Sequence, residues 1–303
     1  MSQGVIIKAL SGFYYIESDG MIYQTRARGV FRKRGQSPLV GDVVEFESSN
    51  LQEGTLTKIL PRKNTIVRPP VANVDVGIIV MSAVEPEFST HLVDRFLVYL
   101  EGLQVHPIIM VTKTDLLTAQ GLEKLEDIRK QYQKIGYPVF FGQEVMKDKT
   151  QFLEALKGQK VIFLGQSGVG KSTLLNEMIP DLNQETGEIS NALGRGRHTT
   201  RHVSLHEIEG VWIADTPGFS TVDFMGIEKE DLPHLFPEFV EVEHECKFRE
   251  CSHQHEPNCA VIAAVESGDI WQERYDHYLN FYEELDQRKP VYKRKKIVRG
   301  DRT

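Results

Sequence analysis

Short runs of alternating apolar and polar residues fill the first 68 positions of the chain and predict β-strands. Turn signals at Ser11-Gly12, Asp19-Gly20 and Val40-Gly41-Asp42 separate several of these runs. The predicted strands are Gly4–Leu10, Gly12–Glu17, Met21–Arg28, Val40–Phe46 and Thr55–Leu60. Five strands of this length indicate a small barrel of the oligonucleotide-binding type, which we assign to residues 1–68.

The pattern changes after Arg68-Pro69-Pro70, a stiff linker in which each proline fixes its own φ and restricts the preceding residue. Beyond it, apolar strands alternate with helical periodicity, which predicts a mostly parallel sheet with helices on both faces at residues 71–222. The predicted strands are Val74–Met81, Pro107–Val111, Pro138–Phe141, Lys160–Leu164, Val203–Glu207 and Val211–Ala214. The predicted helices are His91–Gly102, Leu122–Ile135 and Thr173–Met178.

The last predicted domain, residues 223–303, is rich in helical patterns. Apolar residues from Val261 to Leu285 recur at helical spacing and predict one long helix over Ala260–Gln287, with its apolar side packed in a core. A basic tail follows this helix. We therefore expect a multidomain α/β protein with a β-barrel, a nucleotide-binding sheet and a helical C-terminal domain.

Composition narrows the class of protein. The 303 residues are 40% hydrophobic and 26% charged, values typical of a soluble globular protein, and no apolar run approaches the length of a membrane helix. The net charge of −7 combines +4 in residues 1–68 and +7 in residues 288–303, which leaves −18 between them. Such segregation favours a polyanionic partner contacted by the basic ends, although a solvated surface is the alternative. We expect a cytoplasmic monomer without membrane association.

One basic run in the barrel region has aromatic residues close to it, Tyr23 and Phe31. Cations can pair with phosphates and an aromatic ring can stack on a base, so this combination favours RNA binding. A solvated hairpin remains an equal alternative on this evidence alone. The basic residues are Arg26, Arg28, Arg32, Lys33 and Arg34.

The strongest local motif is a phosphate loop that lies between a predicted strand and a predicted helix. Its glycines allow backbone N–H groups to surround phosphates at a helix N-terminus. Lys171 can reach the β- and γ-phosphates, where we expect it to act in catalysis, and the Ser172 hydroxyl suits Mg²⁺. The predicted contacts are Gly165, Gln166, Ser167, Gly168, Val169, Gly170, Lys171, Ser172 and Thr173.

A second motif, Thr112-Lys113-Thr114-Asp115, follows a predicted strand and resembles the base-reading loop of GTPases. The Asp115 carboxylate can accept from guanine N1–H and N2–H₂, donors that adenine lacks in this arrangement, and Lys113 would lie along the base. Thr112 replaces the usual asparagine, so the tetrad is a partial match. These four residues are our candidates for reading guanine.

A third motif, Asp215-Thr216-Pro217-Gly218, follows the strand Val211–Ala214 and fits a metal and γ-phosphate sensor. Asp215 would hold Mg²⁺ through water, and the Gly218 N–H would contact the γ-phosphate. Phe219 occupies the position where many small GTPases carry a glutamine that orients water. Phenylalanine cannot do this, so another group must place the water or the basal rate must be very low.

The polar segment Asn183–Thr200 lies between the phosphate loop and the sensor and resembles a switch that orders around Mg²⁺. Its last residues include Thr199 and Thr200, which the sequence leaves as alternatives; we take Thr200, with Ser172, as the Mg²⁺ ligand and as a catalytic residue. His198 is our candidate to orient the attacking water, and an exposed histidine without a role is the alternative.

These motifs occur in an unusual order along the chain. GTPases usually run phosphate loop, switch, sensor, base loop, whereas here the base loop comes first. Moving the chain ends into a loop after the sensor preserves every strand, so the order predicts a circularly permuted GTPase domain.

Three cysteines and a histidine near the C-terminus suit a closed tetrahedral zinc site with a structural role. With four protein ligands no coordination position stays open for a catalytic water. Three buried neutral cysteines are the alternative, and His244 and His255 compete as ligands. The predicted ligands are Cys246, Cys251, His253 and Cys259.

Taken together, these segments resemble the ribosome small-subunit-dependent GTPases of the RsgA family, also called YjeQ or YloQ, over essentially the whole chain. The family's nucleotide motifs match Thr112–Asp115, Gly165–Thr173 and Asp215–Gly218. Its zinc ligands match the cysteine and histidine cluster, its candidate catalytic histidine matches His198, and its hydrophobic residue after the sensor matches Phe219. The chain departs at Phe141-Gly142-Gln143-Glu144, where many GTPases have a Ser-Ala loop that contacts guanine.

The resemblance implies slow GTP hydrolysis that the small (30S) ribosomal subunit stimulates, and a role in late maturation of that subunit. It implies binding to 16S rRNA and a requirement for Mg²⁺ with GTP and for structural Zn²⁺. Two other functions remain to be weighed: a phosphate-loop ATPase or kinase with a zinc module, and an RNA-binding scaffold whose nucleotide site is structural.

Overall fold

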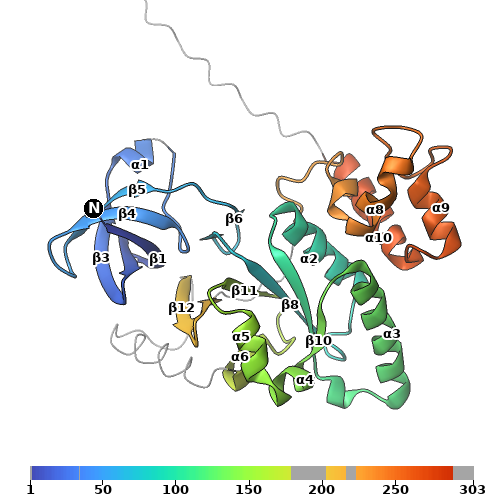
Figure 1. Ribbon diagram of the computed structural model, residues 1–303, viewed down its shortest axis with the longest axis horizontal. Coiled ribbons are helices and arrows are strands. Elements are labelled where there is room, and N and C mark those ends of the chain that lie inside the picture. Colours follow the sequence, from blue (N-terminus) through green and yellow to red (C-terminus); the bar gives the residue numbers. More distant parts are fainter. Residues whose placement is uncertain (1, 34, 179–202, 216–222, 289–303) are drawn as a thin grey trace, which may run out of the picture. The chain divides into compact units, whose positions relative to one another are not determined.

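The computed structural model describes residues 2–33, 35–178, 203–215 and 223–288, and forms two compact units, Met1–Asp223 and Phe224–Thr303 (Figure 1). In the described part of the chain, no helix combines the length and apolar character needed to cross a membrane.

The N-terminal part of the first unit is the five-stranded barrel predicted from the sequence (Figure 1). Its strands are β1 (Ser2–Leu10), β2 (Phe13–Ser18), β3 (Met21–Ala27), β4 (Val43–Ser48) and β5 (Gly54–Ile59). Antiparallel pairing of β1 with β4 and parallel pairing of β3 with β5 close the barrel, which has the expected oligonucleotide-binding-like form. The alternating apolar side chains of Ile6, Ile16, Val44, Phe46 and Leu56 are buried and fill it.

One short helix and a two-stranded ribbon complete the barrel region. Helix α1 (Val30–Lys33) lies between β3 and β4 in sequence, and β6 (Thr65–Ile66) pairs with β7 (Val71–Ala72). The predicted proline linker, residues 68–70, lies in the turn between β6 and β7.

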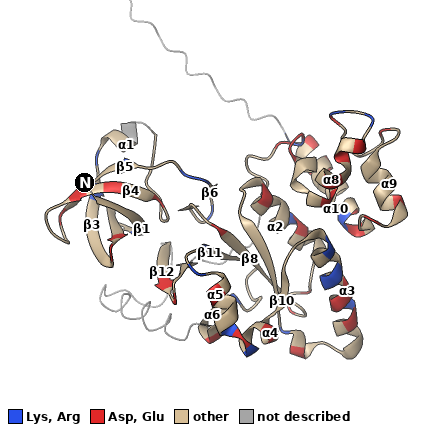
Figure 2. Ribbon diagram, viewed as in Figure 1, with Lys and Arg blue, Asp and Glu red and all other residues tan. Residues whose placement is uncertain are grey.

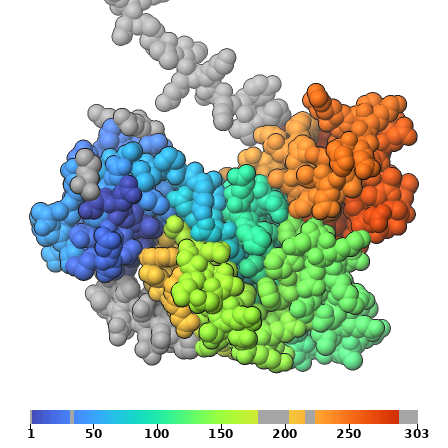
Figure 3. Space-filling view, in the orientation of Figure 1, coloured from blue at the N-terminus to red at the C-terminus, as the bar shows by residue number. Residues whose placement is uncertain are grey.

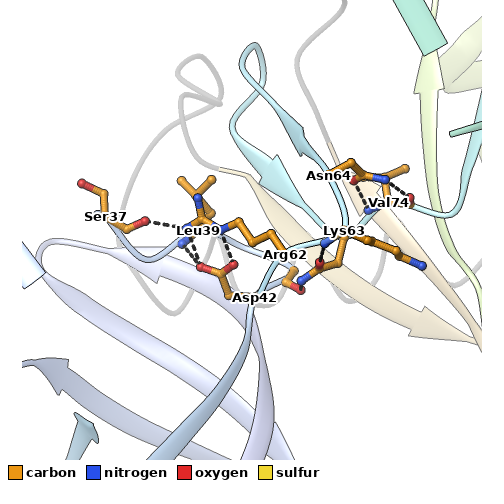
Figure 4. A network of polar contacts seen from close by, with 9 residues as sticks. Ser37, Leu39, Asp42, Arg62, Lys63, Asn64 and Val74 are labelled. Carbon is orange, nitrogen blue, oxygen red and sulfur yellow. Dashed lines mark hydrogen bonds and ion pairs between the residues drawn. The ribbon is translucent and has the colours of Figure 1, made fainter. Parts of the chain in front are cut away.

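Residues just before β4 and just after β5, the last two strands of the barrel, form a polar network (Figure 4). The fully buried Asp42 carboxylate accepts two hydrogen bonds from Arg62, at 2.6 and 2.8 Å, and one from the Leu39 N–H at 2.7 Å. Asn64 forms two hydrogen bonds with the backbone of Val74, at 2.8 and 2.9 Å. The chain that leaves the barrel is thus held by paired polar groups on both sides of the ribbon.

The remainder of the first unit contains a predominantly parallel sheet. Its strands are β8 (Val76–Ser82), β9 (His106–Thr112), β10 (Val139–Phe141), β11 (Lys160–Leu164), β12 (Ser204–Ile208) and β13 (Val211–Asp215). Their order is β10-β9-β8-β11-β13-β12, with β12 antiparallel to β13, and β12 also meets β1 of the barrel at Ser204 and Lys8. Every residue of β8 is buried, as expected for a central parallel strand covered on both faces.

Helices pack on both faces of this sheet. In the space-filling view, the green part of the chain that includes these helices forms much of the visible surface (Figure 3). The helices are α2 (Thr90–Gly102), α3 (Ala119–Ile135), α4 (Gly142–Lys147), α5 (Lys149–Ala155) and α6 (Lys171–Met178). One face of the sheet forms a core with Val145, Phe152 and Leu174 of α4, α5 and α6. On α2, Leu100 packs so closely on Gly77 of β8 that a Cβ there would lie 2.7 Å from its side chain.

The sequence did not predict α4 and α5. Each is too short for a repeated 3.6-residue pattern, so periodicity gave no signal. Asp148 explains the break between them, because it ends α4 while its carboxylate caps α5 by accepting from the Gln151 N–H at 3.2 Å.

The C-terminal unit is helical, and acidic residues are frequent on its helices (Figure 2). Its elements are η2 (Leu232–Leu235), α8 (Pro237–Val242), η3 (Glu243–Glu245), α9 (Ala260–Ser267) and α10 (Gln272–Asp286). The single helix predicted over Ala260–Gln287 was wrong, because the chain turns at Gly268, whose φ of 83° ends α9 in the left-handed conformation. The break could not be predicted from the sequence, because apolar residues recur at helical spacing on both sides of this turn.

Aromatic side chains fill the core of the C-terminal unit. Phe236 and Phe239 stack with their centroids 4.9 Å apart, and Tyr278 meets both rings edge-on. The fully buried Arg274 lies over the Phe236 ring at 4.7 Å and donates to the Glu238 carboxylate. This ion pair ties α10 to α8 inside the core.

Candidate nucleotide and metal sites

The base loop and the phosphate loop lie at the same end of the parallel sheet. Strands β8, β9, β11 and β13 are parallel, so the loops after their carboxyl ends share this end. Along the chain, strands are added first on one side of β8, as β9 and β10, and then on the other side, as β11 and β13. The order therefore reverses between β8 and β11, and such a switch point is where open α/β sheets bind ligands.

The phosphate loop has a backbone that glycine alone permits. Gly165 has a φ of 140°, and a Cβ on it would lie 2.2 Å from the Val80 carbonyl oxygen of the neighbouring strand. Gly168 and Gly170 also have positive φ, at 84° and 92°. The buried Val169 lies between them and anchors the loop in the core of the sheet. The shape of the phosphate loop thus depends on three glycines and on the buried Val169.

Lys171 begins helix α6 directly after this loop. Its amine Nζ donates hydrogen bonds to the carbonyl oxygens of Gly165 and Gln166, both at 2.6 Å, so the side chain folds back over the loop. Burial lowers the pKa of Lys171 below its ordinary value. Ser172 and Thr173, in the first turn of α6, are exposed.

The base loop is attached to the phosphate loop by two side chains. The Thr112 hydroxyl lies 2.5 Å from the Val169 carbonyl oxygen and 3.2 Å from that of Met81. Lys113, with a left-handed φ of 58°, donates through Nζ to the Gly168 carbonyl at 2.9 Å and to that of Glu85. The base loop and the phosphate loop, which are far apart in sequence, are therefore hydrogen-bonded to each other.

The other two residues of the base loop differ in exposure. Thr114 is buried, whereas Asp115 is exposed, and both belong to the short 3₁₀ helix η1 (Thr114–Leu116). The carboxylate that we expect to read guanine is thus open to an incoming base. The sequence carries no sign that Glu85 is a partner of Lys113, because a contact through a backbone carbonyl leaves no signature in residue type.

The segment that departs from the usual guanine-contacting loop forms the start of α4. The Glu144 carboxylate accepts from the Phe141 N–H at 3.3 Å and from Arg129 Nη1 at 2.9 Å. Burial alone would raise the pKa of Glu144, but the Arg129 and Phe141 donors outweigh it and lower the pKa. The Arg129 guanidinium also lies 4.7 Å over the Phe141 ring.

Several predicted site residues lie wholly or partly outside the described part of the chain. Asp215 ends β13, where its backbone pairs with Ser204, and its side chain is not described. Gly218 and Phe219 of the sensor, together with His198, Thr199 and Thr200 of the predicted switch, lie outside the described residues.

The cysteine and histidine cluster of the C-terminal unit is brought together as the spacing predicts. The ligand atoms of Cys246, Cys251, His253 and Cys259 all lie within 4.8 Å of one another. The His253 ring presents Nδ1, which is 3.3 Å from the Cys259 Sγ and 3.7 Å from the Cys246 Sγ. Three sulfur atoms and one ring nitrogen this close fit a tetrahedral metal ion.

The two competing histidines, His244 and His255, are exposed and do not belong to the metal cluster. Polar groups hold the backbone beside the cluster: the Tyr275 hydroxyl donates to the His253 carbonyl at 2.7 Å, and the Tyr278 hydroxyl donates to that of Ser252. The helical spacing of these tyrosines indicated core packing only, so their hydroxyl contacts are additional findings.

Comparison with known proteins gives the same picture. The model described as RsgA GTPase matches residues 59–225, the RsgA N-terminal domain matches residues 3–56, and a 50S ribosome-binding GTPase model matches residues 160–294. Proteins named small ribosomal subunit biogenesis GTPase RsgA are 52% identical in Streptococcus pyogenes, covering 96% of this chain and 98% of that protein, and 52% identical in Enterococcus faecalis, covering 97% and 98%.

Solved structures match as well. The circularly permuted GTPase YloQ has a TM-score of 0.82 at 42% identity, covering 96% of this chain and 97% of that one. YjeQ from Thermotoga maritima has a TM-score of 0.82 at 32% identity, covering 95% and 99%.

The barrel, the motif order along the sheet and these likenesses define a circularly permuted phosphate-loop GTPase with a C-terminal helical region. More specifically, the chain belongs to the RsgA GTPase family. The resemblance drawn from the sequence is therefore confirmed, as are the predicted fold class and the assignment as a GTP hydrolase.

Proposed function

We propose that the chain binds GTP at the sheet edge and hydrolyses it to GDP and phosphate during late maturation of the small ribosomal subunit. The observation that carries this proposal is the attachment of the base loop to the phosphate loop through Thr112 and Lys113. A nucleotide that bridges the two loops would meet a preformed site. The proposed GTP contacts are Thr112, Lys113, Thr114, Asp115, Gly165, Gln166, Ser167, Gly168, Val169, Gly170, Lys171, Ser172, Thr173, Asp215 and Gly218.

Magnesium is the cofactor we propose for the phosphates, with Ser172 and Thr200 as its protein ligands. Mg²⁺ held there would supply positive charge to offset the negative charge that develops on the phosphates. Lys171, freed from its two loop carbonyls, would pair with the β- and γ-phosphates. His198 is proposed to orient the attacking water, since Phe219 has no hydrogen-bonding group.

Zinc is the metal we propose for Cys246, Cys251, His253 and Cys259. The three sulfur atoms and one imidazole are the donors that Zn²⁺ takes in structural sites, and four protein donors complete its coordination. Its role would be to stabilise the C-terminal unit, whose loop between Cys246 and Cys259 contains little regular structure.

The partner we propose is the small ribosomal subunit, bound through 16S rRNA. The relatives are named for biogenesis of the small ribosomal subunit, which supports the choice of subunit. In the barrel, the exposed Arg26 lies 4.4 Å over the half-buried Phe13 ring, so a cation and an aromatic ring lie side by side. This arrangement supports contact with phosphates and bases. We propose that the protein acts as a monomer in the cytoplasm.

The decisive experiment measures GTP hydrolysis by the wild type and by His198→Ala, each with and without purified small subunits. We expect slow turnover that rises strongly with subunits in the wild type, and little rise in the variant. Equal wild-type rates with and without subunits, at salt concentrations that permit binding, would contradict the ribosomal part of the proposal. Competition by ATP as strong as that by GTP would contradict guanine recognition by Asp115.

A further inference from the structure

Glu256 lies between two members of the metal cluster in sequence, and hydrogen-bond donors surround its carboxylate. Oε1 accepts from the backbone N–H and the hydroxyl of Ser252, at 2.7 and 2.6 Å. Oε2 accepts from the backbone N–H groups of Gln254 and His255, at 2.9 and 3.1 Å. One carboxylate therefore closes a loop of five residues, 252–256, that has His253 within it.

The enclosed residue, His253, has an unfavourable backbone conformation. Its φ of 53° lies in the left-handed region, which is unfavourable for a residue with a side chain. Its neighbours on both sides in sequence donate N–H groups to Glu256, while its own carbonyl accepts from the Tyr275 hydroxyl. The backbone that aims the imidazole is thus held from two directions.

The carboxylate form is needed for all four hydrogen bonds. Burial alone would raise the pKa of Glu256, but the donors from Ser252 and the loop backbone outweigh it and lower the pKa to about 2. An amide in the same place offers one acceptor oxygen, and its NH₂ group would face N–H donors. Glutamine therefore has the right shape and the wrong hydrogen-bonding pattern.

We propose that Glu256 is a positioning residue for the metal site: it binds no metal itself, and it fixes the loop that aims His253 at the three cysteine sulfurs. This inference rests on the proposed zinc site. Groups that hold metal ligands from outside the coordination sphere typically contribute 10- to 100-fold to metal affinity. Both oxygens of Glu256 are fully used by the loop, which separates its role from that of a fifth ligand.

The test compares Glu256→Gln with Glu250→Gln, a matched control because Glu250 is an exposed glutamate two residues before this loop. Zinc-loaded full-length protein is titrated with a coloured chelator, and the released zinc is measured. We expect Glu256→Gln to bind zinc about 10- to 100-fold more weakly. The control should stay within about twofold of the wild type. A Glu256→Gln variant that also stays within about twofold would overturn the proposal.

Two further variants allow the proposal to be tested if Glu256→Gln does not fold. Ser252→Ala removes one hydroxyl donor, and Tyr275→Phe removes the hydroxyl that holds the His253 carbonyl. Each should weaken zinc binding by less than the loss of the carboxylate, and wild-type affinity in both would overturn the proposal. Wild-type protein that takes up no zinc would instead refute the metal site itself, so the two failures are distinguishable.

Discussion

The hydroxyl of Thr112 lies 2.5 Å from the backbone carbonyl oxygen of Val169, and this hydrogen bond joins the base loop to the phosphate loop across 57 positions of sequence. Thr112 occupies the place where GTPases usually have asparagine. Its short side chain still reaches the loop because β9 ends at Thr112, next to the core position that holds Val169. The partial match in the motif thus retains a tie between the two loops.

We expect Thr112→Val to weaken GTP binding by on the order of tenfold, because the change leaves the Val169 carbonyl without its hydroxyl donor in a buried place. Thr112→Ser keeps the hydroxyl and is the matched control. Titration with a fluorescent GTP analogue measures both. Unchanged affinity in the valine variant would show that the loops keep their arrangement without this hydrogen bond.

The buried pair of Arg274 and Glu238 gives a stability prediction for the C-terminal unit. Arg274→Met leaves the Glu238 carboxylate buried without its partner, which should destabilise this unit by about 3–5 kcal/mol. The double variant Arg274→Met/Glu238→Leu removes both charges and should recover much of that loss. Equal losses in the single and double variants would contradict this reasoning.

These free energies can be measured by the fluorescence of Trp271, which precedes α10. The chain has two tryptophans, so a Trp212→Phe background leaves Trp271 as the reporter during denaturant unfolding.

Removal of metal from the cysteine and histidine cluster should destabilise the C-terminal unit and, with Mg²⁺ kept in excess, leave nucleotide binding intact. In the same Trp212→Phe background, a zinc-selective chelator should lower the unfolding midpoint reported by Trp271, because metal binding to the folded cluster stabilises it. Cys259→Ser, which loses a ligand, serves as the control and should respond little to the chelator. A chelator that abolishes GTP binding while Trp271 unfolding stays unchanged would contradict the assignment.

Low pH should destabilise the start of α4, because the Glu144 carboxylate becomes protonated. Its pKa is lowered in the folded protein, so its carboxylate adds stability above the ordinary value of 4.5 and loses that contribution as pH falls below it. Because the side chain is 44% exposed, we expect less than about 1 kcal/mol. The loss of unfolding free energy between about pH 6 and pH 3 should be smaller in Glu144→Gln than in the wild type. Identical losses would rule this contribution out.

Local sequence patterns predicted most of the sheet, since β-branched and apolar runs such as β8 and β11 are buried on both faces and bounded by turn or loop residues. They failed where the controlling interaction was not periodic. Helices α4 and α5 are too short to repeat, and Gly268 ends α9 by a backbone conformation inside an apolar pattern that continues. The predicted domain boundaries and site residues stay predictions.

The sequence by itself determined the chemistry of this protein: a phosphate loop that needs three glycines, a base loop ahead of it in a permuted order, and four metal donors within 14 positions. Those features depend on residue type and spacing, which a sequence states directly. Tertiary structure alone decided that Thr112 and Lys113 hold the phosphate loop and that Glu256 closes the loop around His253. Most of these contacts involve backbone carbonyl and N–H groups, which nearly every residue carries, so only the folded chain reveals which ones meet.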